Sequence, residues 1–473
     1  MPPLPSSSFP RVVWSCQSLV LTAIVCALSA LIALPYAVDH VIPSNSLPPA
    51  IVWRAGFSLL AWVDALLRVL TPPNLSLFRE LMGYVHTVEL YTAAELGLAD
   101  AIARAGVPLS VEGVTISQLA VATAPGCIEI ELNDPTSPAA CAAVELRVER
   151  LLRALASYGI FRESGKKSGT GGPARAWTNT AASDFLRIDH AASLRPAVLN
   201  FGAVQMAMMA KLPDAVRSGI SSFSAVHGSE MWDYYAAHPD SHAIFDATMN
   251  ALGKLGAADV AIATGVEWSK WADILIDVGG GFGEMALTIL QQTPLSSSVS
   301  LQLSAIIFDL PHVVARAEQV WKHGATGGAA AGVSSRLAAR PDLRSRVSFV
   351  GGDMFDSSTY PKNPNSQTAF LLRDILHDWP DNASVRILKG VRGAMVKGDS
   401  VVIVGRVLIP GAGFIESLGS ADADIVMMGA FGSTAGERSV EHYARLFAEA
   451  GLVLESATPT RSQYYIIRAV AAV

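Results

Sequence analysis

The second half of the chain alternates short apolar runs with segments of helical spacing. The runs ADILIDV, SAIIFDL, RVSFV, TAFLL and SVVIV contain few polar positions, and MALTILQQ, VVARAEQVWK and VRILKGVRGAM follow three of them. Strands of this kind are buried on both faces, as they are when helices cover both sides of a parallel sheet. The pattern predicts an α/β domain with a parallel sheet over residues 266–473.

The preceding residues, 49–265, show helical spacing instead. Apolar positions recur every three or four residues in IVWRAGFSLLAWVDALLRVL, LFRELMGYVHTVELYTAAELGLADAIA and VELRVERLLRALASY. Gly159 ends the third of these helices, and SGKKSGTGGPARAWTNT then predicts a glycine-rich wing before a short strand. With further helices expected up to about Gly265, this part is predicted to be a helical, winged-helix-like domain.

Three segments need a separate interpretation. The helix IVWRAGFSLLAWVDALLRVL contains three charged residues that would be costly in lipid, so we interpret it as a packing or dimerisation helix. APGCIEIELNDPTSPAACAA is predicted to be a loop. GATGGAAAGVSS, residues 324–335, has low complexity and predicts a surface insertion without an assigned function.

The first 48 residues are predicted to be an apolar leader. Residues 12–34 are apolar apart from Gln17 and a few small hydroxyls, and Pro35 ends the run. About 20 such residues span a bilayer core, whereas a signal peptide has an apolar core of roughly 7–15 residues. We predict a signal anchor or targeting segment, with membrane association or import into a chloroplast or mitochondrion. The alternative is a buried helix in a cytoplasmic protein.

Composition excludes several classes of function. The chain has 473 residues and a formal net charge of −6, so no basic surface favours nucleic acid as a partner. Its four cysteines form no CxxC pair and predict neither a disulfide framework nor a zinc site. No other His, Asp or Glu cluster has clear metal-ligand spacing.

A glycine-rich loop follows the first predicted strand. DVGGGFGEMA places Gly279, Gly281 and Gly283 in a G-x-G-x-G pattern, with Glu284 where a dinucleotide fingerprint has its last Gly or Ala. Glycine permits a tight turn and close approach of the backbone to a ligand. By itself the loop is weak evidence for a binding site.

Two acidic residues end the next two predicted strands. Asp309 in FDLPHV stands where a carboxylate can accept hydrogen bonds from both ribose hydroxyls. Asp353 in GGDMF precedes Met354, which can lie against an adenine ring. Each acid alone would also suit a helix N-cap or a turn. Together with the glycine loop, however, they occupy three successive strand ends and predict a nucleoside-containing ligand.

The stretch ILHDWPD follows the apolar run AFLL, so His377 stands where a buried strand ends. A histidine in this place is either a structural residue or a base that points into a cleft. The residues considered so far leave both interpretations open.

In content and order, these motifs resemble the plant caffeate-type and acetylserotonin-type small-molecule methyltransferases, which use S-adenosylmethionine. The resemblance runs from about Leu77 to the C-terminus, with interruptions by insertions. It rests on ELYTAAELGLAD, RLLRALASYGIF, DVGGGFGE, FDLPHV, GDMF, LLRDILHDWPDNASVRILKGV and GERSVEHYARLFAEAGL. It implies a Rossmann-like class I methyltransferase domain behind a winged-helix-like domain that dimerises and helps to close the acceptor pocket. It also implies a homodimeric, metal-free enzyme with a small-molecule acceptor.

The resemblance assigns roles to residues of this chain. His377 would be the general base and Glu437, in GERS, the acid that orients it, while Asp378 completes the HDW signature at the acceptor pocket. Phe245 and Met249 would line the methyl-transfer pocket. The cofactor would contact the glycine loop at Gly279, Gly281 and Gly283, with Gly279 along its methionine part. It would also contact Asp309 at the ribose, Asp353 and Met354 at the adenine, and Arg373 near the carboxylate.

These roles favour O-methylation. A phenol has a pKa of about 10 and is mostly protonated at neutral pH. A neutral histidine within hydrogen-bond reach can remove the proton during transfer, which is worth roughly 10²–10⁴-fold in rate. Alignment of the acceptor with the methyl group can supply a further ~7–11 kcal/mol.

One departure keeps a second hypothesis open. The fifth strand ends in VVIVGRVLIP, with Gly405 where relatives have an acid, so a second support for the histidine is expected to be missing. A thioether sulfur needs no base, and relatives in algae and bacteria S-methylate 4-methylthio-2-hydroxybutyrate for dimethylsulfoniopropionate biosynthesis. A third hypothesis is a non-catalytic regulatory dimer, which loss of cofactor binding would favour.

Overall fold

The computed structural model describes residues 50–104, 114–116, 119, 138–167, 173–190, 192–253, 258–293, 303–324, 328–411, 419–432 and 434–472. The predicted leader, residues 1–48 with the apolar run 12–34, lies outside them. The chain forms two compact units, Met1–Thr71 with Ile409–Gly419, and Pro72–Leu408 with Ser420–Val473. The first unit contains helix α2 (Ala50–Leu70), as its apolar spacing predicts. Among the described residues, no helix is both long and apolar enough to cross a lipid bilayer.

The N-terminal part of the second unit has the predicted helices and wing. Strands β2 and β3 form an antiparallel hairpin after the turn at Gly159, which has a φ of +74°, and β1 pairs with β3. Leu152, Phe161 and Trp177 are fully buried in the core between this sheet and the helices. The elements are α3 (Pro73–Leu81), α4 (Gly83–Glu95), α5 (Leu98–Arg104), β1 (Val114–Thr115), α7 (Pro138–Ser157), β2 (Phe161–Lys167) and β3 (Pro173–Asn179).

A group of short helices follows the wing. Helix α21, which lies far along the chain, packs against them because Ser221 Oγ donates a hydrogen bond of 2.7 Å to Ala430 O, and Ala430 shares a core with Met208 and Phe223. The helical part and the sheet-containing part therefore share one core at this point. The elements are α8 (Ala181–Asp184), α9 (Arg195–Asn200), the π-helix η1 (Phe201–Gln205), α10 (Met206–Met209), α11 (Leu212–Ser218), α12 (Ser222–His227), α13 (Met231–Ala237), α14 (Pro239–Gly253), α15 (Ala258–Ala263), η3 (Trp268–Lys270) and α21 (Ser420–Phe431).

The second half forms a seven-stranded sheet in the order β6-β5-β4-β7-β8-β10-β9. The first five strands of this order are parallel, as predicted, whereas β10 pairs antiparallel with both β8 and β9. The strands are β4 (Ile274–Val278), β5 (Ser304–Asp309), β6 (Val347–Gly351), β7 (Thr368–Arg373), β8 (Ser400–Gly405), β9 (Leu452–Pro459) and β10 (Tyr465–Ala471).

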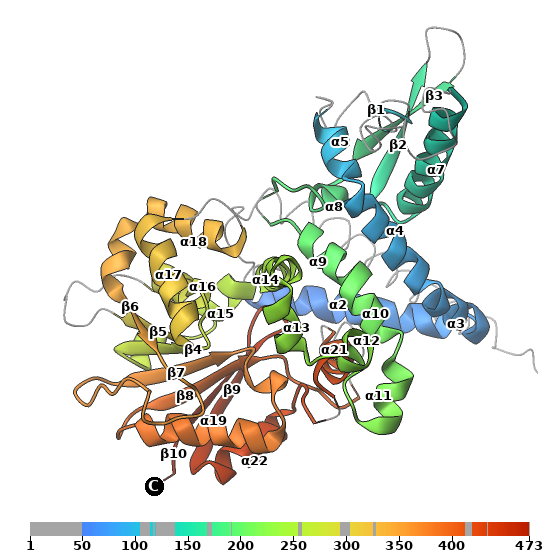
Figure 1. Ribbon diagram of the computed structural model, residues 1–473. Helices are drawn as coiled ribbons and strands as arrows, with labels where there is room; N and C mark the ends of the chain where they lie inside the picture. Colours follow the sequence, from blue (N-terminus) through green and yellow to red (C-terminus); the bar gives the residue numbers. More distant parts are fainter. Residues whose placement is uncertain are drawn as a thin grey trace, which may run out of the picture. The chain divides into compact units, whose positions relative to one another are not determined.

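Helices cover both faces of this sheet (Figure 1). Successive strand residues alternate between the two helical layers, so Leu275 and Ile307 pack on one side and Ile276 and Phe308 on the other. Burial on both faces explains the uninterrupted apolar runs in the sequence. The first layer contains α16 (Glu284–Gln292), α17 (Pro311–His323) and α18 (Gly328–Ala339), the second contains α19 (Asp381–Ala394) and α22 (Val440–Glu449), and η5 (Pro341–Arg346) and η6 (Leu376–Asp378) are short 3₁₀ turns.

The prediction of a surface insertion at residues 324–335 is wrong. Helix α18 begins at Gly328, and its side chains Val333 and Leu337 are fully buried in the core. These two apolar residues have helical i, i+4 spacing. Two large apolar residues among Ala and Gly are too few to give a recognisable helical pattern in the sequence. The C-terminal end of the predicted loop, from Pro138, likewise belongs to helix α7, while residues 121–137 lie outside the described residues.

The buried face of α18 can be tested by truncation. We expect Leu337→Ala to lower the free energy of unfolding by about 2–5 kcal/mol, because it leaves a cavity in a packed core. The exposed neighbour Ser335→Ala should change it by less than about 0.5 kcal/mol. Urea denaturation of the full chain measures both, and equally small effects would show that α18 does not belong to the core.

Candidate active site

The structure brings His377, Glu437 and Asp378 together. His377 lies in the turn η6 directly after strand β7, and its Nδ1 is 2.9 Å from Glu437 Oε1 while its Nε2 is 3.3 Å from Asp378 Oδ1. The side chains of His377 and Glu437 are only 12% and 1% exposed. Both imidazole nitrogens therefore face a carboxylate in a largely buried setting.

This arrangement favours the imidazolium form of His377. Burial opposes a charge on the ring, but the carboxylates of Glu437, Asp378 and Asp374 outweigh it and raise the pKa of His377 to about 10. Burial also raises the pKa of Asp378 to about 7. The site is thus a strongly coupled set of acids around one histidine.

Arg438 connects the two segments that carry the pair. Its guanidinium, on a residue only 2% exposed, donates to Leu376 O at 2.6 Å and to Trp379 O at 2.7 Å, on either side of His377. Arg438 follows Glu437 directly, and Gly436 N donates to His377 O at 2.9 Å. Because both segments are bound to each other through the backbone, the imidazole and the carboxylate are held at a defined separation.

The turn before His377 contains an unusual backbone conformation. Asp374 has a φ of +51° and is the only described non-glycine residue with a positive φ. This left-handed conformation is rare outside glycine, although Asp and Asn tolerate it better than most residues. Tyr464 donates a hydrogen bond of 2.9 Å from its hydroxyl to Asp374 Oδ2, which ties the turn to the residue before β10.

At the end of β8 the structure differs from the expectation for Gly405. A Cβ atom on Gly405 would lie 3.3 Å from the hydroxyl of Tyr443, so this residue borders a packed aromatic ring. The next residue, Arg406, lies beside the pair formed by His377 and Glu437, with Nη1 3.7 Å from Glu437 Oε1. The neighbour of the pair at this strand end is therefore a cation, and Asp378 provides the second carboxylate at His377.

The glycine loop has the conformation that its residue types allow. Gly279, Gly281 and Gly283 have φ values of +69°, +54° and +79°, which disfavour any side chain. Gly281 N donates to Asp309 Oδ2 at 2.9 Å, and a Cβ on Gly281 would point into open space. A Cβ on Gly279 would lie 2.5 Å from Ile375, so the loop packs closely against the turn that carries His377.

The predicted cofactor residues lie at the carboxyl edge of the parallel strands, where open α/β sheets bind ligands. Asp309 ends β5 and is half-buried, while Asp353 and Met354 follow β6 with Asp353 exposed. Asp309 accepts backbone N–H groups on both carboxylate oxygens, from Gly281 and from Leu310, whereas Asp353 accepts one, from Phe355 on Oδ1. Accessible carboxylates beside an open glycine loop fit a ligand with ribose hydroxyls.

Two further acids in this region were missed in the sequence. Arg373, expected at the cofactor carboxylate, forms an ion pair of 2.7 Å with Asp259 of α15, a helix far from the motifs in the chain. Asp277, inside DVGGG, is 3% exposed, and its Oδ2 has no hydrogen-bond partner among the described residues. Burial raises the pKa of Asp277 to about 7. The position of Asp277 directly before the glycine loop was the available signal.

The predicted acceptor residues lie in an aromatic cluster. Phe245 of α14 contacts Trp232 and Tyr235, with ring centroids 5.8 and 4.7 Å apart. Trp232 also contacts Phe431 of α21 at 5.9 Å. Met249, one helical turn beyond Phe245, is 43% exposed. Tyr235 is buried beneath this cluster, whereas Trp232 and Met249 are partly exposed and provide apolar surface suited to a planar ligand.

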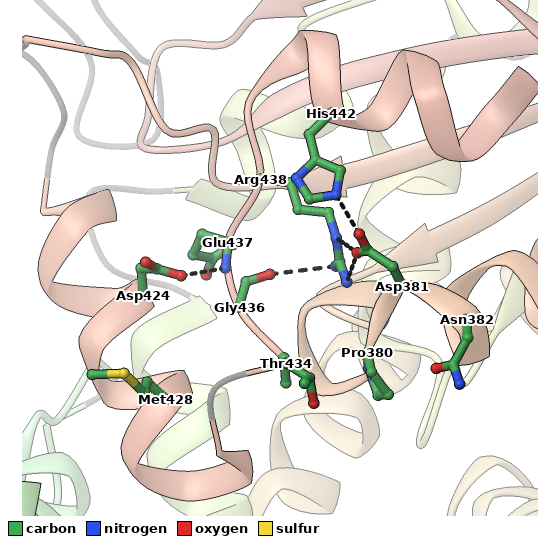
Figure 2. A pocket seen from close by; sticks show the side chains of 11 residues that line it. Pro380, Asp381, Asn382, Asp424, Met428, Thr434, Gly436, Glu437, Arg438 and His442 are labelled. Carbon is green, nitrogen blue, oxygen red and sulfur yellow. Dashed lines mark hydrogen bonds and ion pairs between the residues drawn. The ribbon is translucent and has the colours of Figure 1, made fainter. Parts of the chain in front are cut away.

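The segment of Glu437 also borders a cavity of about 680 Å³. Figure 2 shows the residues that line it. Its polar side chains are already paired within the protein: His442 Nε2 lies 2.6 Å from Asp381 Oδ2, and Asp424 Oδ1 accepts from Glu437 N at 2.8 Å. Pro380 and Asn382 from the start of α19 and Met428 and Thr434 from the region of α21 complete the wall. Among the described residues, no three His, Cys, Asp or Glu side chains gather closely enough to hold a metal ion.

Comparison with known protein families shows to which family the chain belongs. The O-methyltransferase domain family matches residues 209–453, more than half of the chain, and the O-methyltransferase dimerisation domain matches residues 78–188. The chain belongs to the O-methyltransferase domain family. It is an S-adenosylmethionine-dependent methyltransferase of the small-molecule O-methyltransferase type, which confirms the resemblance and the fold class predicted from the sequence.

Individual relatives agree with this assignment. The phenazine O-methyltransferase PhzM of Lysobacter antibioticus is 29% identical over 84% of this chain and 96% of its own. The 3-amino-4-hydroxybenzoate 4-O-methyltransferase of Streptomyces cremeus is 28% identical over 82% of this chain and 88% of its own. The crystal structure of human N-acetylserotonin methyltransferase with S-adenosylmethionine has the same fold, with a TM-score of 0.63, 20% identity, and coverage of 85% and 99%.

The raised pKa of His377 predicts how stability depends on pH. The stabilisation from protonated His377 should be complete below its ordinary pKa of about 6.5 and should be lost as pH rises through about 10. The difference in unfolding free energy between wild type and His377→Gln should therefore shrink from pH 6 to pH 10. Urea denaturation at several pH values measures this difference, with the exposed His323→Gln as a control. A difference that grows with pH would contradict the assignment.

Proposed function

We propose that this enzyme methylates a hydroxyl oxygen of a small metabolite, with His377 as the general base. The observation that carries the proposal is the pair formed by His377 Nδ1 and Glu437 Oε1 at 2.9 Å beside the glycine loop. In the neutral ring, the N–H group at Nδ1 donates a hydrogen bond to Glu437. The lone pair of Nε2 is then available to accept the proton of the acceptor hydroxyl. The acid thus selects the tautomer and the orientation of the ring.

The residues of the glycine loop fit S-adenosylmethionine. When bound, this cofactor supplies an electrophilic methyl group on a cationic sulfonium. Gly279, Gly281 and Gly283 would hold its methionine part and Asp309 its ribose. Asp353 and Met354 would hold the adenine, and Arg373 is proposed to act near the carboxylate together with its partner Asp259. These residues bind and orient the donor, while His377 accepts the proton of the acceptor.

The aromatic cluster supports an aromatic or similarly planar acceptor. Phe245 and Met249 lie on one face of α14, and Trp232 and Phe431 extend the apolar surface to α13 and α21. Asp378 is proposed to border this pocket from the HDW turn. A ligand held in place on this surface loses translational freedom before reaction, which is a large part of the rate advantage of such enzymes.

S-methylation of a thioether acid remains the second candidate function. One observation favours it, namely that the acids around His377 hold its imidazole protonated, which would impede a base but not a thioether acceptor. The third hypothesis, a non-catalytic dimer, has no support, because the chain belongs to a family of methyltransferases. The domain boundaries at residues 48 and 265 and the targeting role of the leader also remain proposals.

Replacement of His377 distinguishes the first two functions. We expect His377→Gln to reduce turnover of hydroxylated acceptors by roughly 10²–10⁴-fold, because the base is lost, with S-adenosylmethionine affinity nearly unchanged. Release of S-adenosylhomocysteine measures turnover, with one pool of phenols and one of thioether acids, and His323→Gln is the control. If thioethers are methylated and their turnover survives in His377→Gln, the proposed function is S-methylation and not O-methylation.

Dimerisation is proposed to use the first helices of the second unit. Five large apolar side chains of α3 and α4 are more than half exposed in the single chain: Leu75, Leu77, Phe78, Leu81 and Tyr84. These helices belong mostly to the matched dimerisation domain. Exposed apolar surface on this scale commonly marks a protein interface.

The double variant Leu77→Asp/Leu81→Asp tests this interface. Both side chains lie on one face of α3, so two carboxylates there should convert the dimer to a monomer in sedimentation velocity. The matched variant Val216→Asp/Ile220→Asp, at equally exposed apolar positions elsewhere, should leave the dimer intact. A wild-type chain that sediments as a monomer would refute the proposal.

A further inference from the structure

Arg406 is a largely buried cation at the end of strand β8. Its side chain is 16% exposed, and its guanidinium lies 5.1 Å from the ring centre of Tyr464. Its Nη1 is 3.7 Å from Glu437 Oε1 and 3.9 Å from Asp374 Oδ1. Both distances are those of ion pairs rather than hydrogen bonds, so Arg406 is not locked to either acid.

The oxygen that faces Arg406 is the one that holds the base. Glu437 Oε1 lies 2.9 Å from His377 Nδ1 on one side and 3.7 Å from Arg406 Nη1 on the other. One carboxylate oxygen is thus shared between an imidazole and a guanidinium. An acid whose charge is already balanced by a guanidinium attracts an imidazolium less strongly.

The other charges around His377 do not provide this balance. Asp374 and Asp378, from the turn after β7, add to the negative charge, as does Glu437 from the segment before α22. The two other guanidinium groups nearby are matched by their own acids. Arg373 pairs with Asp259 at 2.7 Å, and Arg438 pairs with Asp381 at 3.0 Å.

We propose that Arg406 is a positioning residue that acts through Glu437: it takes up part of the negative charge of this acid and thereby makes it easier for His377 to lose its proton. The proposal rests on the function of His377 as the general base. It also explains why a strand end with no acid at Gly405 is compatible with catalysis, since the neighbouring residue adjusts the existing pair instead of adding another carboxylate to it.

The test measures the titration of His377 directly. Full-length protein with isotope-labelled histidine is titrated by NMR without acceptor, and the signal of His377 is assigned by its loss in His377→Gln. We expect Arg406→Met to move the midpoint to higher pH by about one unit, because the acids are then unopposed. Arg406→Lys, which keeps the charge, should remain near wild type. Arg386→Met, which removes an exposed cation on α19, should have no effect.

Activity provides the second measurement. At neutral pH, Arg406→Met should lose up to about tenfold in kcat for each unit of midpoint shift, because a stronger base offsets only part of the lost neutral fraction. Activity should recover at alkaline pH, with KM for the acceptor unchanged. A merely structural role would not be rescued by pH. An unchanged midpoint in folded Arg406→Met would overturn the proposal, and so would a raised KM with an unaltered pH profile, since Arg406 would then bind the acceptor.

Two controls keep the outcomes separate. If Arg406→Met does not fold, Arg406→Gln takes its place, with the same expected shift and the same contradicting result. If no hydroxylated acceptor is methylated and His377→Gln changes nothing, the proposed function fails. The NMR midpoint would still show whether Arg406 opposes the acids, so the two failures are distinguishable.

Discussion

The arrangement of the site depends on the guanidinium of Arg438. It binds the carbonyl oxygens of Leu376 and Trp379, which flank the histidine, while the preceding residue carries the acid partner of that histidine. Charge-assisted hydrogen bonds of this kind are among the stronger polar contacts in proteins. Without them, the carbonyl oxygens of Leu376 and Trp379 would keep only longer hydrogen bonds, such as those from Ser384 Oγ at 3.3 and 3.2 Å. The contact between His377 and Glu437 is thus a consequence of backbone geometry and not of two flexible side chains that happen to meet.

Backbone geometry also fixes the cofactor side of the site. Gly279 has no side chain, so Ile375 can pack within a distance that any Cβ would prevent, and Ile375 is two residues before His377. The loop proposed to hold the methyl donor and the turn proposed to hold the base are therefore in van der Waals contact. A short path between donor and base is what a transfer reaction with concurrent proton removal requires.

The sequence predicted those features that depend on local pattern. Uninterrupted apolar runs indicated the five parallel strands, and glycine spacing with strand-end acids indicated the cofactor loop, since each rests on residues close in the chain. The antiparallel β9 and β10 were not predicted, because pairing direction depends on the chain path and not on composition. Helix α18 was missed because its fully buried apolar side chains, as far as the structure describes them, are Val333 and Leu337 among Ala and Gly.

The electrostatic partners were harder to predict for a different reason. Asp259 is more than a hundred residues from Arg373, and no local motif marks it as the partner of that cation. Arg406 directly follows Gly405, but no sequence motif indicates that its guanidinium faces Glu437. The twist of a strand and the residue at which it ends determine whether a charged side chain faces a site. A shift of one position turns the side chain to the opposite face.

The high pKa of His377 is less of an obstacle to catalysis than it first suggests. A base with a pKa of about 10 matches a phenol of similar pKa, so proton transfer between them is nearly isoenergetic. The cost lies in the resting site, where roughly one molecule in a thousand would hold a neutral ring at pH 7. Lowering the pKa by one unit increases that fraction about tenfold but weakens the base by a smaller factor, so catalysis gains until the pKa approaches the working pH. A cation that shares the acid with the base, as Arg406 does, adjusts this compromise without contact with the reacting atoms.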